Sequence, residues 1–250
     1  MGRASAVLRF CALAAVVVAW FAVAPHLPAI GEWPNILLVS FVVLPGTLLL
    51  VLIALPLWPR WQLLTPAAAV LALLALGFSE AGWGLPENFA KLFAAVFAGW
   101  AFVMLFEHLS WVVLVAAVIP LADAVSVWRG PTHSITAHHF HVYLDVAIAF
   151  VVPHGAAAYL GPPDILFYAL FLGAAARWHL RVGWTWIAMT FMYSFTVVLA
   201  NALNVSGLPA LPFLSFGFLV ANADLLWRAI RPSADSSASP SSSDGGQAQS

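Results

Sequence analysis

The stretch Gly161-Pro162-Pro163-Asp164-Ile165-Leu166-Phe167-Tyr168-Ala169-Leu170-Phe171-Leu172-Gly173 places one carboxylate at the mouth of an apolar segment long enough to enter a bilayer. A second apolar segment, residues 112–127, carries Asp123. Ionisable side chains inside membrane spans are energetically costly, and they commonly mark functional sites. We therefore predict that Asp123 and Asp164 are functional partners. The alternative is structural: both are polar residues near span ends that bond backbone groups or water.

The composition is that of an integral membrane protein. Of 250 residues, 63% are hydrophobic and only 8% are charged, whereas a soluble domain has about 45–50% apolar and about 25% charged residues. The formal net charge of −1 gives no indication of nucleic-acid binding. The single cysteine, Cys11, excludes an intramolecular disulfide.

We expect an all-α fold, a polytopic bundle of about eight transmembrane helices formed by residues 1–231. The polar tail at residues 232–250 has no apolar content to bury and is expected to be disordered. The expected spans are Val7–Ala24, Ile36–Leu57, Leu63–Phe78, Phe89–Phe106, Ser110–Val127, Pro163–Arg177, Gly183–Leu203 and Leu208–Trp227. Pro45 and Gly46 interrupt the second span, a break that neighbouring helices can satisfy.

Three features leave alternatives open. Val7–Ala24 is predicted to be a retained helix, although Ala22-Val23-Ala24 also resembles a signal-peptidase site. Val146–Val152 is too short to cross a bilayer, so we expect it to be interfacial or re-entrant.

The polar loop before Val146 contains His133, His138, His139 and His141. We predict that this loop is solvated and binds no metal; the alternative is a metal site, because imidazoles suit metal binding. We expect no cofactor.

The order of the spans brings the two aspartates to one side of the membrane. Asp123 lies six residues before Arg129, so it is about 9 Å below the point where its helix leaves the bilayer. Asp164 begins the next span, and both carboxylates then lie near the same surface if the loop between them does not cross.

The charge distribution predicts that both termini are cytoplasmic and that the loop at residues 129–162 is outside. Only Lys91 and Arg129 disagree with this orientation. The small size and the lack of a large extramembrane domain favour a prokaryotic inner membrane. The cytoplasmic side then carries Arg3, Arg9, Arg60, Arg177, Arg181, Arg228 and Arg231.

Residues 110–227 resemble the presenilin and signal peptide peptidase family of intramembrane aspartyl proteases, and prokaryotic presenilin-like members in particular. Gly161 and Asp164 are similar to the family's Gly-x-Gly-Asp segment, and Asp123-Ala124-Val125-Ser126 is similar to its other catalytic span. Gly207-Leu208-Pro209-Ala210-Leu211-Pro212 is similar to its Pro-Ala-Leu motif, and the three occur in the family's order.

The chain departs from the family pattern at several points. Pro163 stands where the family has the glycine before its second aspartate, and Ala122 stands where a tyrosine usually precedes the first. The family usually has nine spans, whereas we expect eight. Proline fixes φ near −65°, so the approach to Asp164 is less flexible than in the family.

The resemblance implies catalysis by an aspartate dyad. Close carboxylates in a low-dielectric site share one proton; the ionised member activates water, and the protonated member polarises the scissile carbonyl. Pro209 and Pro212 are expected to hold Ala210 and Leu211 out of helical geometry, so that an extended substrate pairs with them. A helix that simply begins with prolines is the alternative. The expected substrate-binding residues are Gly161, Tyr168, Pro209, Ala210 and Leu211, with Tyr168 also interpretable as packing.

The leading functional hypothesis is therefore an intramembrane aspartic endopeptidase that contacts membrane lipid and cleaves single-span membrane proteins or signal-peptide remnants. A proton- or cation-coupled transporter is the alternative, because intramembrane carboxylates also mark such pathways. A catalytically inactive relative that binds membrane segments is a third hypothesis. A metalloenzyme that uses the histidine loop is the least favoured.

Overall fold

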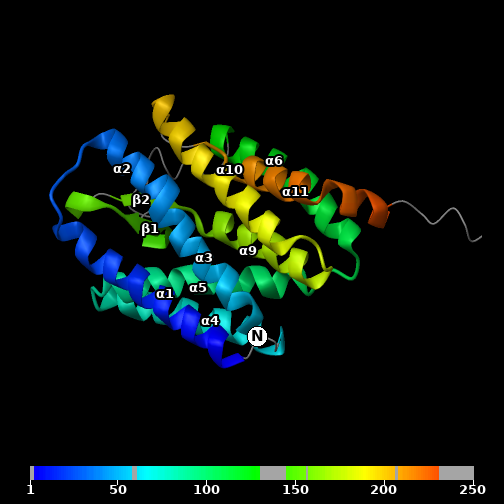
Figure 1. The fold of residues 1–250 in the computed structure, drawn as a ribbon, viewed down its shortest axis with the longest axis horizontal. Helices are drawn as coiled ribbons and strands as arrows, with labels where there is room; N and C mark the ends of the chain where they lie inside the picture. Colours follow the sequence, from blue (N-terminus) through cyan, green and yellow to red (C-terminus); the bar gives the residue numbers. More distant parts are fainter. Residues whose placement is uncertain (1–2, 58–60, 130–144, 156, 206–207, 231–250) are drawn as a thin grey trace, which may run out of the picture.

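The computed structural model describes residues 3–57, 61–129, 145–155, 157–205 and 208–230, and these residues are mostly helical (Figure 1). Each predicted span contains helix, so the expectation of a predominantly helical fold is confirmed. The main helices are α1 (Arg3–Val23), α2 (Glu32–Leu38), α3 (Leu44–Ala54), α4 (Leu64–Glu80), α5 (Gly84–Val103), α6 (Leu109–Arg129), α9 (Pro162–Arg177), α10 (Val182–Ala202) and α11 (Leu211–Ile230). The short helical turns are η1 (Ala24–His26), η2 (Val39–Val43), η3 (Leu55–Leu57), η4 (Trp61–Leu63) and η5 (Pro153–Gly155).

Four helical segments of the described chain are long and apolar enough to cross a membrane. They are Ala4–His26, Glu32–Leu57, Leu109–Ser126 and Val182–Ala202, while Leu64–Glu80 is apolar but shorter. Large apolar side chains on these helices point outward, as Leu73 and Leu121 do with 67% and 69% of their surface exposed. These features are those of a membrane protein. The predicted tail at residues 232–250 lies outside the described residues.

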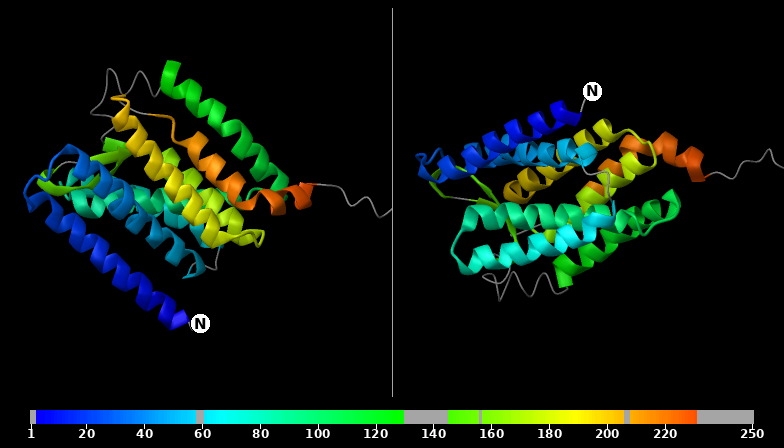
Figure 2. Two further views of the ribbon diagram at one scale, coloured as in Figure 1. Left: turned by 45° about the horizontal axis from the view of Figure 1, so that its top comes forward. Right: turned by 90° about the horizontal axis from the view of Figure 1, so that it is seen from below.

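Helix α9 is the centre of the bundle. Its residues from Tyr168 to Ala175 are buried, and it packs against α5 on one side and against α10 and α11 on the other (Figures 1 and 2). The contact with α5 is close because Gly99 has no side chain: a Cβ atom there would lie 2.3 Å from the carbonyl oxygen of Leu166. Small residues that let backbones approach are typical of helix pairs in membranes.

The second predicted span is helical but contains one π turn, η2, between α2 and α3. Here the N–H of Leu44 bonds the carbonyl of Val39, and Pro45 has no N–H to give to the carbonyl of Ser40. The hydroxyl of Ser194 on α10 donates to that carbonyl instead. A neighbouring helix therefore satisfies the backbone group released by Pro45, as the sequence led us to expect.

A β-hairpin precedes α9, and the sequence analysis did not predict it. Strand β1 (Ile148–Val151) pairs antiparallel with β2 (Ala157–Leu160), in the register Ile148 with Leu160. The segment Val146–Val152, expected to be interfacial or re-entrant, thus contains a strand. Left-handed backbone at His154 (φ 67°) and Gly155 (φ 70°) makes the reversal.

Side chains from two helices attach the hairpin to the bundle. The amide of Asn88 on α5 both donates to and accepts from the backbone of Ala149, at 2.9 and 2.7 Å. The indole of Trp20 on α1 donates to the carbonyl of Val151 at 3.0 Å. Strand β2 ends one residue before Gly161, so the hairpin and its attachments fix where α9 begins.

Candidate functional site

Asp164 lies in the first turn of α9, three residues after Gly161, which is the N-cap. Pro162 and Pro163 occupy the first helical positions, where a missing N–H is not needed. The Asp164 N–H bonds the Gly161 carbonyl at 3.1 Å, and the Gly161 backbone also acts on the Asp164 carboxyl group. An acid at this position corresponds to the acidic half of a capping box. An acid at a helix N-terminus is also favoured by the helix dipole.

Asp123 lies on α6, close to the start of α11. It is partly buried, and its Oδ2 atom accepts a hydrogen bond from the N–H of Leu211 at 3.0 Å. Leu211 is the first residue of α11, so its N–H has no partner within its own helix. The side chain of Asp123 therefore caps a helix that lies 88 residues further along the chain.

The two aspartates lie on helices that pack against one another. The charge of Asp123 acts on the carboxyl group of Asp164, and α6 and α11, which position Asp123, both pack against α9. The carboxyl groups thus belong to one electrostatic site. Its parts are two helix N-termini, of α9 and α11, and the C-terminal half of α6.

Tyr193 on α10 is a member of this site that the sequence analysis missed. Its side chain is 1% exposed, and it lies near enough to Asp164 to act on the carboxyl group of that residue. The only available signal was a tyrosine in the middle of an apolar span, which is compatible with ordinary packing.

The Pro209–Pro212 segment differs from its prediction. Leu211 and Pro212 belong to α11, so the expected non-helical conformation is wrong for these two residues, because Pro212 is accommodated in the first turn. The carbonyl of Ala210 accepts from Phe213 and Leu214, each at 3.1 Å, and Asp123 takes the N–H of Leu211. Two of the backbone groups expected to receive a substrate are therefore already bonded.

The remaining part of this segment is not helical. Leu208 and Pro209 have neither helix nor strand geometry, and Pro209 and Ala210 are buried. Gly207 lies outside the described residues. The segment therefore forms a largely buried, irregular lead into Leu211, whose N–H Asp123 accepts.

Tyr168 lies in the core, four residues after Asp164 in α9. It is fully buried, and its hydroxyl lies 2.7 Å from that of Thr190 on α10. This contact fits the packing interpretation. Gly161, in contrast, contacts Asp164 directly through its backbone.

Two cavities lie away from the aspartate pair. One of about 550 Å³ lies between the ends of α1 and α5 and the hairpin, and includes the Glu87–Lys91 ion pair. The other, of about 490 Å³, has Glu107, His108 and His179 in its wall. Neither cavity has Asp123 or Asp164 in its lining.

The described residues contain no group of three or more histidine, cysteine or acidic side chains placed to hold a metal. The four histidines of the loop, His133, His138, His139 and His141, lie outside these residues. No family model, curated protein or solved structure matches the chain.

Proposed function

We propose that the chain is an intramembrane aspartyl protease that hydrolyses peptide bonds in transmembrane segments with Asp123 and Asp164. The observation that carries the proposal is the interaction between two carboxyl groups from separate helices of a membrane bundle. The presenilin-like order of the sequence motifs supports it. The substrates are single-span membrane proteins or signal-peptide remnants.

The chemistry follows from two acids that share a low-dielectric environment. Two adjacent carboxylates do not both ionise there, so the pair holds one proton. The ionised member removes a proton from water as the water oxygen attacks the peptide carbonyl, and the protonated member donates to the carbonyl oxygen. Collapse of the tetrahedral species breaks the C–N bond and returns a proton to the amine.

Both aspartates are partly exposed, and in our proposal a substrate reaches them from this exposed side. The Asp123–Leu211 hydrogen bond links α6 to the start of α11. In our proposal, a substrate separates these elements and lies against Gly161, Pro209 and Ala210. The carboxylate of Asp123 then exchanges the Leu211 N–H for the attacking water.

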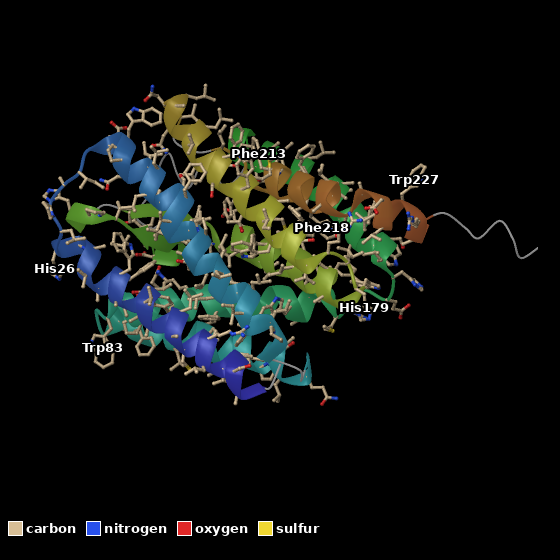
Figure 3. All side chains as sticks on the ribbon, viewed as in Figure 1. His26, Trp83, His179, Phe213, Phe218 and Trp227 are labelled. Atoms are coloured by element: carbon tan, nitrogen blue, oxygen red, sulfur yellow. The ribbon has the colours of Figure 1, made fainter. Side chains whose placement is uncertain are left out.

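We further propose that all eight helical segments cross the membrane, with both termini in the cytoplasm. His26 and Trp83, from the turns after α1 and α4, lie at one end of the molecule, and His179 and Trp227 lie at the other (Figure 3). A chain that crosses the membrane eight times places His26 and Trp83 at one surface and His179 and Trp227 at the other. The end with His179 carries the exposed Arg177 and Arg181, and such positive charge favours a cytoplasmic location.

The test uses a tagged single-span reporter expressed with the wild-type chain, Asp123→Asn or Asp164→Asn. The proposal requires wild-type cleavage and complete loss in each variant, because either carboxamide destroys the shared proton. Asp224→Asn is the matched control: Asp224 pairs with Arg181 at 2.9 and 2.8 Å on an exposed surface, and this variant keeps activity. Fragments that persist in Asp123→Asn or Asp164→Asn overturn the dyad.

The second candidate is a proton- or cation-coupled transporter. It is favoured by the position of both aspartates on apolar helices of the bundle, since intramembrane carboxylates also mark proton and cation pathways. Reconstituted vesicles distinguish the two: a transporter gives a proton-linked flux that requires Asp164 and produces no reporter fragments. A chain that shows neither reporter cleavage nor flux fits the third hypothesis, a catalytically inactive relative that binds membrane segments.

A further inference from the structure

We propose that the cavity of about 550 Å³ between α1, α5 and the hairpin binds the zwitterionic headgroup of phosphatidylethanolamine. The lipid phosphate lies against the ammonium group of Lys91, and the ethanolamine ammonium lies against the carboxylate of Glu87. This inference does not depend on the chemistry of Asp123 and Asp164, because neither aspartate lines the cavity.

The cavity lies at the level where a lipid headgroup is found. The candidate span Ala4–His26 ends one residue after Pro25, which lines the cavity. Gly84, the first residue of α5, lines it as well and directly follows Trp83. His26 and Trp83 lie at the same end of the molecule (Figure 3). Trp83 is 59% exposed, and exposed tryptophans are typical of the membrane–water interface.

An ion pair forms the charged part of the cavity wall. Lys91 pairs with Glu87, which lies one turn earlier on α5. Such a pair on an exposed helix face needs no ligand, but these two side chains are only 15% and 16% exposed. Withdrawal of two charges from water is costly, and charged side chains in membrane helices commonly belong to functional sites.

The pair can bind further groups without separating. A lysine ammonium has three N–H donors and a carboxylate has two acceptor oxygens. The described contact joins Nζ of Lys91 to Oε1 of Glu87, so donors on Lys91 and the Oε2 atom of Glu87 can bind a ligand. The adjacent amide of Asn88 is already bonded to Ala149 in both directions. Recognition in this wall therefore depends on one positive and one negative group.

A zwitterion fits this arrangement better than a ligand of one charge. An anion that approached Lys91 would also meet the carboxylate of Glu87, and a cation would meet the ammonium of Lys91. A phosphoethanolamine group presents a phosphate to Lys91 and an ammonium to Glu87. Its primary ammonium has N–H donors for the Oε2 atom, whereas choline has none. The pair therefore selects phosphatidylethanolamine over phosphatidylcholine.

The apolar surroundings fit the remainder of the lipid. Phe21, Leu85 and Val151 also line the cavity, and they provide contacts for the glycerol and the first methylene groups. Val16 and Val23 on α1 are 65% and 51% exposed, so the acyl chains can lie against α1 within the bilayer. The cavity volume is within the range of about 300–1,000 Å³ that is usual for small-molecule sites.

The first test uses Lys91 as a reporter, because it is the only lysine of the chain. The full chain in detergent micelles, labelled with ¹³C-lysine, gives a single Cε signal in an NMR spectrum. We expect phosphatidylethanolamine to shift this signal in a saturable titration, whereas phosphatidylcholine and phosphatidylglycerol leave it in place. A signal that does not respond to phosphatidylethanolamine overturns the proposal. Soluble phosphoethanolamine that shifts the signal at the same concentration as the lipid shows that the headgroup comes from solution, and it overturns the assignment to a lipid.

The second test measures lipid binding to variants by native mass spectrometry. Lys91→Met removes the ammonium group, and we expect the affinity for phosphatidylethanolamine to fall about tenfold or more, as for the loss of one hydrogen bond to a charged group. Glu87→Gln leaves Lys91 charged, so the preference should change to the anionic phosphatidylglycerol. Asp224→Asn is the matched control, because Asp224 belongs to an exposed ion pair with Arg181, and it keeps the wild-type preference. An unchanged preference in Glu87→Gln overturns the inference.

The double variant Glu87→Gln with Lys91→Met guards against misfolding. Each single substitution leaves one largely buried charge without its partner, whereas the double variant removes both charges with little change in volume. We expect it to fold and to bind phosphatidylethanolamine and phosphatidylcholine equally. A retained preference for phosphatidylethanolamine overturns the proposal. The readout is lipid binding, so a failure of the proposed protease leaves this test unaffected.

Discussion

The Oδ2 atom of Asp123 lies 3.0 Å from the backbone nitrogen of Leu211. Through this bond, one candidate catalytic acid satisfies the first N–H of the helix that follows the Pro-Ala-Leu stretch. The bond also gives Asp123 a structural role that is separable from proton transfer. An experiment on this residue therefore has to distinguish loss of the cap from loss of the acid.

Asp123→Ala and Asp123→Asn separate these two roles. Alanine leaves the Leu211 N–H without its acceptor, and we expect a loss of about 1 kcal/mol in the free energy of unfolding. Asparagine retains an oxygen acceptor, so its stability stays close to that of the wild type, although the proposed chemistry is lost. Thermal unfolding in detergent measures the first effect and reporter cleavage the second. A stable Asp123→Ala variant would show that the cap contributes little.

The Gly99–Leu166 contact predicts that α5 and α9 tolerate no side chain between them. A Cβ at Gly99 would lie 2.3 Å from the Leu166 carbonyl and 2.9 Å from Cβ of Ala169. Because the backbone of α5 or α9 has to move to make room for this Cβ atom, we expect Gly99→Ala to destabilise the protein by about 1–3 kcal/mol. Thermal unfolding in detergent measures this change.

Gly46→Ala is the control for this substitution. Gly46 lies in α3, and its Cβ position has no neighbouring atom within 4 Å. Alanine is the better helix former, so this variant should gain up to about 1 kcal/mol. If the two variants lose stability equally, the effect is a general one of glycine replacement and not a close helix contact.

The sequence was sufficient to predict the helices, while the convergence of Asp123 with Asp164 stays a prediction. Both rest on local information: apolar length for the helices, and for the aspartates the side of the membrane at which successive spans begin and end. The hairpin was missed because a hydropathy reading tests only whether Val146–Val152 is long enough to cross. Its strand is stabilised by β2 and by Asn88, which is 61 residues from Ala149 in the sequence.

The other differences also concern contacts between distant segments. Ser194 on α10 bonds the carbonyl of Ser40 in η2, and these residues are 154 positions apart in the sequence. The start of α11 was misplaced because proline was interpreted as a helix breaker. At Pro212 it lies in the first turn, and the N–H of the preceding Leu211 is satisfied by Asp123.

The contacts of Asn222 with Arg181 and Thr185 predict a stability effect at the N-terminal end of α10. Its fully buried amide accepts from the N–H of Arg181 at 3.1 Å and donates to Thr185 at 2.8 Å and to Phe218 at 2.9 Å. Asn222→Leu leaves the Arg181 N–H and the Thr185 hydroxyl without this partner, so we expect a loss of about 2 kcal/mol or more. Hydrogen exchange should rise in the first turn of α10.

Asn201→Ala is the matched control for Asn222. The Asn201 amide donates only to the Val197 carbonyl of its own helix, at 2.8 Å, and is partly exposed. Its removal should change the free energy of unfolding by about 0.5 kcal/mol or less. Equal losses in the two variants would contradict a specific role for the Asn222 bonds between α10 and α11.

The side-chain amide of Asn88 holds the hairpin next to the start of α9. Its amide pairs with both backbone groups of Ala149, as a neighbouring strand would. Asn88→Ala removes both bonds, and we expect faster hydrogen exchange across β1 and β2 while α9 and α10 stay protected. Because β2 leads directly into Gly161 and Asp164, the same variant should also lower reporter cleavage by the proposed protease.

Asn35→Ala is the control for Asn88→Ala, since the Oδ1 atom of Asn35 has no hydrogen-bond partner among the described residues. Unchanged exchange at Ala149 in Asn88→Ala would show that the hairpin is held by packing alone.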